Sequence, residues 1–136
     1  MASRNLKDLV LSVQLKIEEF LSLCAKDGIE ILVYCTKRTY AEQDGLYEIG
    51  RKLPGKIVTN ARGGFSWHNF GRAVDFVPIV SGKPQWSNDV LYRRCGILAE
   101  SIGLEWAGRW TGSLKETAHL QYREGRSLEQ ERKEHE

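Results

Sequence analysis

The segment SWHNFGRAVDFVPI, residues 66–79, decides the fold of this chain. Its second half predicts a β-strand, because Val74 and Phe76 alternate with smaller or polar residues. Val74 and Phe76 are expected to face the core, so Asp75 points to the opposite face, which a glycine and an alanine keep open. His68 precedes a tight turn and is expected to return to the same region as Asp75.

Outward from this strand, hydrophobic periodicity predicts a mixture of helices and antiparallel strands without βαβ repeats, which is typical of an α+β domain. The expected helices cover residues 5–27, 40–50 and 87–102, the other strands cover 29–35, 104–106 and 118–122, and a long loop covers 51–67. Asn5 is expected to cap the first helix, and Ser87 or Asn88 the third. Residues 126–136 predict a charged, mostly solvated tail, either a helical extension or a frayed end.

Composition favours one globular domain over residues 1–136, with a catalytic core at about 29–122 and no internal repeat. The net charge of +2 gives no electrostatic reason to expect a nucleic-acid partner. No apolar run approaches the ~18 residues of a membrane span, so no membrane insertion is expected. The three cysteines, Cys24, Cys35 and Cys95, form no CxxC pair and are interpreted as small buried hydrophobic residues. A monomer is expected.

A metal site is the chemistry that the polar residues favour. His68 and Asp75 make two ligands of a catalytic zinc site, and His119 begins a later apolar strand and supplies a third. Glu116 stands three residues before His119, where its carboxylate can accept a proton from water and pass it to a leaving amine. Zn²⁺ is therefore the expected cofactor.

Arg38 follows the end of the strand expected at residues 29–35 and is placed to lean over a site built on the sheet. A fixed positive charge there stabilises a developing oxyanion. Taken singly, each of these residues has an ordinary structural role as an alternative: a hydrogen-bonded histidine, a strand-end aspartate, a solvated glutamate or a surface arginine. The joint pattern beside glycine-rich loops favours the catalytic interpretation.

Together, these residues resemble the signature SxHxxGxAxD of zinc peptidases that act on peptidoglycan, the D-alanyl-D-alanine carboxypeptidases and dipeptidases and the phage L-alanyl-D-glutamate endopeptidases. The resemblance implies a hedgehog or D-Ala-D-Ala metallopeptidase-like fold, a small antiparallel sheet with flanking helices. It implies zinc ligands at His68, Asp75 and His119 and a catalytic carboxylate at Glu116, followed by His119 as in the family's acidic-x-x-His. The segment RTYAEQ, residues 38–43, is similar to the family's arginine-x-x-x-Glu-Gln stretch. This similarity implies that Arg38 binds the substrate carbonyl.

Two further roles come from the resemblance alone. Ser66 is implied to hydrogen-bond the substrate or a zinc ligand. GLEWAGRW, residues 103–110, resembles the family's Gly-Leu-x-Trp-Gly-Gly-x-Trp stretch and implies that Trp106 lies near the metal and contacts substrate.

The leading functional hypothesis is an L-alanyl-D-glutamate endopeptidase of endolysin type, acting on bacterial peptidoglycan stem peptides. The loop at residues 58–76 and the segment EQDGLYEIGR are most similar to that branch. A D,D-carboxypeptidase or D,D-dipeptidase is the alternative within enzymes, and a non-catalytic zinc-stabilised wall-binding module is the alternative of another class. The N-terminal residues predict no secretion signal, so the protein is expected to be made in the bacterial cytoplasm and to act on the wall after release.

Overall fold

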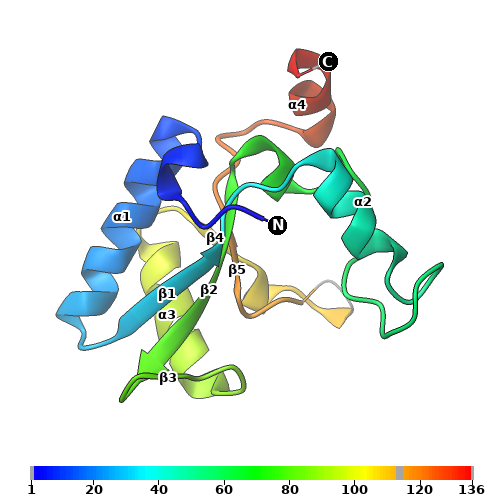
Figure 1. Cartoon of the computed structure of the whole chain (residues 1–136). Coiled ribbons are helices and arrows are strands. Elements are labelled where there is room, and N and C mark those ends of the chain that lie inside the picture. The colour runs from blue at the N-terminus through cyan, green and yellow to red at the C-terminus, as the bar shows by residue number, and fades with distance from the viewer. Residues whose placement is uncertain (1, 113–114, 136) are drawn as a thin grey trace.

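The computed structural model describes residues 2–112 and 115–135, and its centre is strand β2 (Ala73–Val80). β2 pairs with β1 (Glu30–Cys35), β5 (His119–Gln121) and β3 (Lys83–Pro84), and β4 (Glu105–Trp106) pairs with β5. All four pairings are antiparallel, in the order β1-β2-β5-β4 with β3 at the end of β2. The expected α+β class and the small antiparallel sheet with flanking helices are confirmed (Figure 1).

Two helices, α1 (Leu11–Lys26) and α3 (Asp89–Ser101), cover one side of the sheet. Between them and the sheet lies the hydrophobic core, to which Val74 and Phe76 contribute as predicted. The fully buried members from the two helices and the sheet are Val13, Ile17, Phe20, Cys24, Val74, Phe76, Val77, Cys95, Ala99 and Leu120. All three cysteines are free and buried, which confirms the interpretation of them as buried residues.

The other side of the sheet carries α2 (Tyr40–Glu48) and the long loop that follows it (Figure 1). Thr39 caps α2 with a reciprocal capping box to Glu42. Two short 3₁₀ turns contact the sheet: η2 (Trp67–Phe70) contacts β2, and η3 (Ala107–Arg109) contacts β5. Asp75 points to this side, yet it is itself buried, because the side chains around it cover its carboxylate.

The first predicted helix is divided in the structure. Asn5 caps the short 3₁₀ turn η1 (Leu6–Asp8), and α1 begins only after the extended residues Leu9 and Val10. The amide of Val10 donates to the carbonyl oxygen of Gly71 at 3.0 Å, so a tertiary contact interrupts a segment whose periodicity is continuous. At the third helix, Asn88 is the cap, accepting from the amide of Leu91.

The C-terminal segment is mostly exposed, as predicted, and of the two forms left open for it the structure has the helical extension. It forms α4 (Leu128–Glu134), capped by Ser127, and Glu131 is the buried exception, only 2% exposed. Most ion pairs of the segment join its own residues, while Glu131 also pairs with Arg72. No helix within residues 2–112 and 115–135 is long and apolar enough to span a membrane.

Candidate metal centre

A cleft of about 790 Å³ opens on the side of the sheet away from α1 and α3, where β1 ends and β2 and β5 begin. Its size is typical of a small-molecule or peptide site. Six of the seven residues predicted for the site line it, the exception being Trp106. Those six are Arg38, Ser66, His68, Asp75, Glu116 and His119.

His68 is held on η2, a single turn fixed at both ends. The hydroxyl of Ser66 accepts from the amide of His68 at the start of the turn. Gly71 ends it with φ 68°, a left-handed conformation that favours glycine. The imidazole is buried, and its Nδ1–H donates to the carbonyl oxygen of Thr36 at 2.7 Å. This bond directs Nε2 toward Asp75, with Nε2 and Oδ1 3.1 Å apart.

Asp75 is the residue that the two histidines share. It pairs across the sheet with His119, and its Oδ1 lies 3.1 Å from Nε2 of His68 and 3.5 Å from Nδ1 of His119. Its other oxygen, Oδ2, accepts from Nη2 of Arg38 at 3.0 Å. Burial on its own would raise the pKa of this carboxyl, but the charge of His68 and the hydrogen bonds from both histidines hold it well below its usual range.

His119 points Nδ1 toward the site, whereas His68 points Nε2. Nε2–H of His119 donates to Oε1 of Gln121 at 2.8 Å, which leaves Nδ1 facing Asp75 and Glu116. The rings of His68 and His119 meet edge to face with centroids 5.2 Å apart. Each imidazole therefore uses one nitrogen in a hydrogen bond within the protein and turns the other toward the same carboxylate.

Two separations within the predicted donor set are compatible with zinc. Ligands bound tetrahedrally at about 2.0–2.2 Å lie about 3.3–3.5 Å from one another. The two separations at Oδ1 of Asp75, 3.1 and 3.5 Å, are close to that spacing. Two imidazoles and one carboxylate are also the ligand set of hydrolytic zinc sites that keep a position open. The hydrogen bonds to Thr36 and Gln121 are the outer contacts that orient such ligands.

Glu116 is the exposed carboxylate of the site. Its side chain is 53% exposed, and Oε2 lies 3.8 Å from Nδ1 of His119. Asp75, Glu116 and His119 form one group whose ligand atoms all lie within 4.8 Å of one another. Both carboxylates line the cleft, but Glu116 is much the more exposed, so it can exchange protons with water and substrate.

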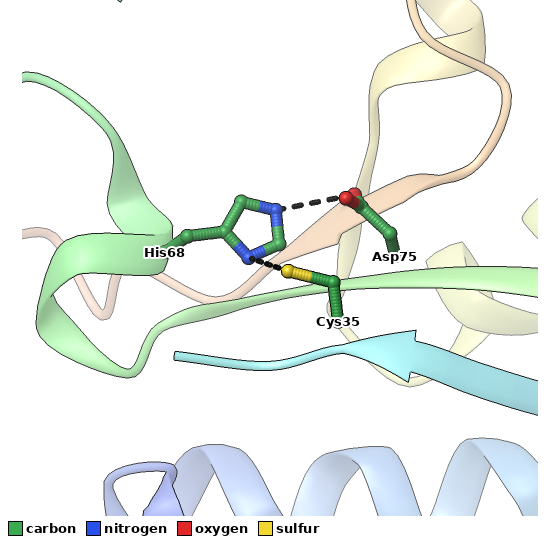
Figure 2. Close-up of side chains that lie close together, drawn as sticks. All are labelled: Cys35, His68 and Asp75. Carbon is green, nitrogen blue, oxygen red and sulfur yellow. Dashed lines mark hydrogen bonds and ion pairs between the residues drawn. The ribbon is translucent and has the colours of Figure 1, made fainter. Parts of the chain in front are cut away.

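Cys35 also lies beside His68, which the sequence did not indicate. Figure 2 shows the His68 ring between two partners, with one nitrogen toward Cys35 and the other toward Asp75. Sγ lies 3.7 Å from Nδ1, and Cys35, His68 and Asp75 form a second possible metal group. Because Nδ1 already donates to Thr36, an ion between Cys35 and that nitrogen would break a buried hydrogen bond. Asp75 is thus shared by two groups of possible ligands, one with His119 and Glu116 and one with His68 and Cys35.

Arg38 lines the cleft but is tied to the protein at two points. Nη2 binds Asp75, and Nη1 donates to Oε1 of Gln43 at 3.1 Å. Gln43 is completely buried, and its Nε2 donates to the carbonyl oxygen of Ala61 in the loop that borders the cleft. The link from Gln43 to Ala61 joins segments distant in sequence, so no local pattern indicated it.

Trp106, which was expected to lie near the metal and contact substrate, does not line the cleft. It is buried in the core, and its indole Nε1 donates to the carbonyl oxygen of Thr117 at 2.8 Å. Trp67 and Trp110 line the cleft instead, and the centre of the Trp110 ring lies 6.0 Å from that of His119. Trp106 thus supports the turn between Glu116 and His119 from behind. The strand period explains the placement, since Trp106 faces Leu120 in the β4–β5 pair.

The charges of the site predict how stability of the metal-free protein depends on pH. Burial lowers the pKa of His68, but the charge and hydrogen bond of Asp75 outweigh it and raise the pKa to about 10. The stabilisation from this raised pKa is complete below the unfolded value of about 6.5 and is lost as the pH rises through 10. The lowered pKa of Asp75 gives stabilisation that is lost only in acid.

With a chelator present, the melting temperature is therefore expected to fall by several degrees between pH 6 and pH 10. Scanning calorimetry across this range measures it. An Asp75→Asn variant is the control and should show a flatter profile. A wild-type melting temperature that stays level or rises would contradict the assignment of His68 and Asp75 as a charged pair.

Comparison with known proteins agrees with this fold and site. Residues 59–122 match a family model described as D-alanyl-D-alanine carboxypeptidase. The peptidoglycan L-alanyl-D-glutamate endopeptidase CwlK of Bacillus subtilis is 36% identical in an alignment of 112 residues that covers 71% of this chain and 63% of that protein. The L-alanyl-D-glutamate peptidase of Listeria phage A118 is 28% identical in an alignment of 123 residues that covers 87% of this chain and 39% of that protein. The chain thus spans less than two thirds of the length of both relatives.

Solved structures show the same fold at lower identity. The L-Ala D-Glu endopeptidase ChiX of Serratia marcescens superposes with a TM-score of 0.66 at 22% identity, over 89% of this chain and 87% of that one. The vancomycin-resistance D,D-pentapeptidase VanY, solved in complex with Zn(II), gives 0.63 at 17% identity, over 92% and 76%. The chain is therefore similar in sequence and fold to the peptidoglycan peptidases of the D-alanyl-D-alanine carboxypeptidase family, and the resemblance predicted from the sequence is confirmed.

Proposed function

We propose that this chain is a zinc-dependent peptidase that hydrolyses the L-alanyl-D-glutamate bond of peptidoglycan stem peptides. The observation that carries the proposal is one carboxylate, Asp75, between two oriented imidazoles, with the exposed Glu116 beside them in an open cleft. The substrate comes from the relatives named L-alanyl-D-glutamate peptidases, of which one is 36% identical.

In this proposal Nε2 of His68, Oδ1 of Asp75 and Nδ1 of His119 hold the zinc ion. A bound zinc ion supplies Lewis acidity that polarises a carbonyl group and lowers the pKa of water. The three ligands carry a single negative charge, that of the Asp75 carboxylate. A zinc ion bound to them would therefore keep a net positive charge, unlike an ion in a structural site with two or more thiolates. His68, Asp75 and His119 are largely buried and line the cleft, so substrate approaches them from the cleft.

Glu116 moves the proton. Its carboxylate accepts a proton from the water whose oxygen attacks the scissile carbonyl carbon, and the same proton passes to the nitrogen as the carbon–nitrogen bond breaks. The products are a new carboxylate on L-alanine and a new amino group on D-glutamate. The distance of 3.8 Å between Oε2 and Nδ1 of His119 keeps this carboxylate beside the ligand set without burying it.

Arg38 supports the site in two ways. Its contact with Oδ2 fixes the orientation of Asp75, so that Oδ1 faces the histidines. A guanidinium has five donor hydrogens, and the bonds to Asp75 and Gln43 account for two of them. A remaining donor can reach a substrate carbonyl, where a fixed positive charge stabilises the oxyanion. Trp110 and Phe65 form aromatic walls of the same cleft.

Product analysis tests the proposal. Purified wall and soluble stem peptides, incubated with zinc-loaded protein, are expected to release new amino-terminal D-glutamate, detected by mass spectrometry after amino-group labelling. A chelator should stop the release, and added zinc should restore it. Free D-alanine as the sole product would instead identify a D,D-carboxypeptidase or D,D-dipeptidase. Wall binding without any new amino group or free D-alanine would identify a binding module.

A further inference from the structure

The C-terminal helix α4 contacts the segment that carries His68 at both ends. We call residues 64–72 the His68 segment: it contains Phe65, Ser66, His68 and the turn at Gly71. Two adjacent residues of α4, Glu131 and Arg132, reach opposite ends of it. None of the residues of α4 lines the cleft, so the helix lies behind the cleft wall.

Arg132 holds the first end. Its Nη1 donates to the carbonyl oxygen of Gly64 at 3.1 Å, and its guanidinium carbon lies 4.1 Å from the centre of the Phe65 ring. Such stacking of a guanidinium on an aromatic face is attractive and restricts the ring. The fit is close at Gly64, where an added Cβ would lie 3.3 Å from Cδ of Arg132. Phe65 is therefore fixed from behind while it lines the cleft.

Glu131 holds the second end. Its side chain is 3% exposed, and Oε1 accepts from Nε of Arg72 at 2.8 Å. Arg126 also donates to Glu131, so the buried carboxylate is paired twice. Arg72 extends the connection through Nη1, which donates to Glu124 at 3.0 Å. A buried charge held by two partners defines one geometry, because separating either pair leaves an uncompensated charge.

We propose that α4 is a positioning clamp for the cleft wall: Glu131 and Arg132 fix the two ends of the His68 segment and thereby set the places of Phe65 and Ser66. The proposal rests on the proposed function only for its kinetic consequence. Its structural content concerns the mobility of residues 64–70. Small displacements of groups that position a substrate have large effects on rate, so a clamp of this kind controls substrate binding without touching substrate.

Arg132→Ala tests the clamp, with Lys133→Ala as the matched control. Lys133 is the next residue in α4, is 72% exposed at its side chain and pairs only with Glu129 among the described contacts. In Arg132→Ala, amide hydrogen exchange across residues 64–70 should be about tenfold faster, while that of α1 stays unchanged. KM for a stem peptide should rise about tenfold with kcat changed less than threefold. Lys133→Ala should match the wild type in both measurements.

A double variant separates positioning from general loss of stability. If Arg132 acts through Phe65, then combining Arg132→Ala with Phe65→Leu should raise KM no further than Phe65→Leu alone. Independent, multiplied effects would overturn the proposal, and so would exchange at residues 64–70 equal to that of Lys133→Ala. Should the wild-type protein cleave no stem peptide, the proposed function fails while the exchange measurement still decides the clamp.

Discussion

Glu116→Gln is expected to retain its zinc ion and to lose hydrolysis, with kcat about a thousandfold lower. The amide keeps the shape of the carboxylate but has no basic oxygen to accept a proton. Because the Glu116 side chain is half exposed and its backbone bonds to Ala107 and His119 do not involve the carboxylate, the fold should be unaffected. Steady-state kinetics on a stem peptide measure the loss of kcat, and metal analysis of the purified variant measures the retained zinc.

A second isosteric change controls for charge. Glu19→Gln removes an exposed carboxylate from α1, where it pairs with Lys16 at 3.8 Å on the far side of the sheet. This variant should cleave at the wild-type rate. If Glu116→Gln kept more than a tenth of wild-type kcat, Glu116 would not be the proton carrier.

Asp75→Asn is expected to lower zinc affinity by more than about a hundredfold and to abolish activity at micromolar zinc. Asp75 supplies the one negative charge of the ligand set and is shared between His68 and His119, so its loss separates the three donors. The substitution also leaves the buried imidazole of His68 and the guanidinium of Arg38 without their common partner. Isothermal titration with zinc after removal of metal measures the affinity.

Asp27→Asn is the matched control, because Asp27 also pairs with an arginine, Arg94, at 2.7 Å, but on the exposed surface between α1 and α3. Zinc affinity should be unchanged there. Excess zinc is expected to restore part of the activity of Asp75→Asn if the remaining ligands keep their places. Wild-type zinc affinity in Asp75→Asn would refute the assignment of the ligand set.

Several elements could be predicted from the sequence because their signals are local. Alternation along residues 73–76 identified the central strand and separated Val74 and Phe76 from Asp75. The spacing from Glu116 to His119 placed two functional groups at the start of β5. Periodicity identified three of the helices, and only the divided first helix departed from it, because Val10 bonds to Gly71 instead of to its own segment.

Contacts between distant segments could not be predicted from such local signals. Trp106 and Trp110 belong to one aromatic stretch, and only the pairing of β4 with β5 turns the first into the core and leaves the second in the cleft. The sequence predicted Cys35 to be a buried hydrophobic residue, and it is buried. Its position at the end of β1, however, also brings its sulfur to 3.7 Å from Nδ1 of His68. The charges of the C-terminal segment predicted solvation, which holds for most of its described residues, but they did not indicate that Glu131 is buried against Arg72.

The sequence alone therefore determined which residue types occur at ligand-like spacing, the fold class and the resemblance to a peptidase family. These properties depend on neighbours within a few positions, through strand and helix periods and turn chemistry. Only the tertiary structure decided which ring nitrogen of each histidine faces Asp75, which tryptophans border the cleft, and that α4 contacts both ends of the His68 segment. Those features arise when sheet pairing and burial bring residues from separate segments within hydrogen-bonding distance, and local periodicity does not specify such pairs.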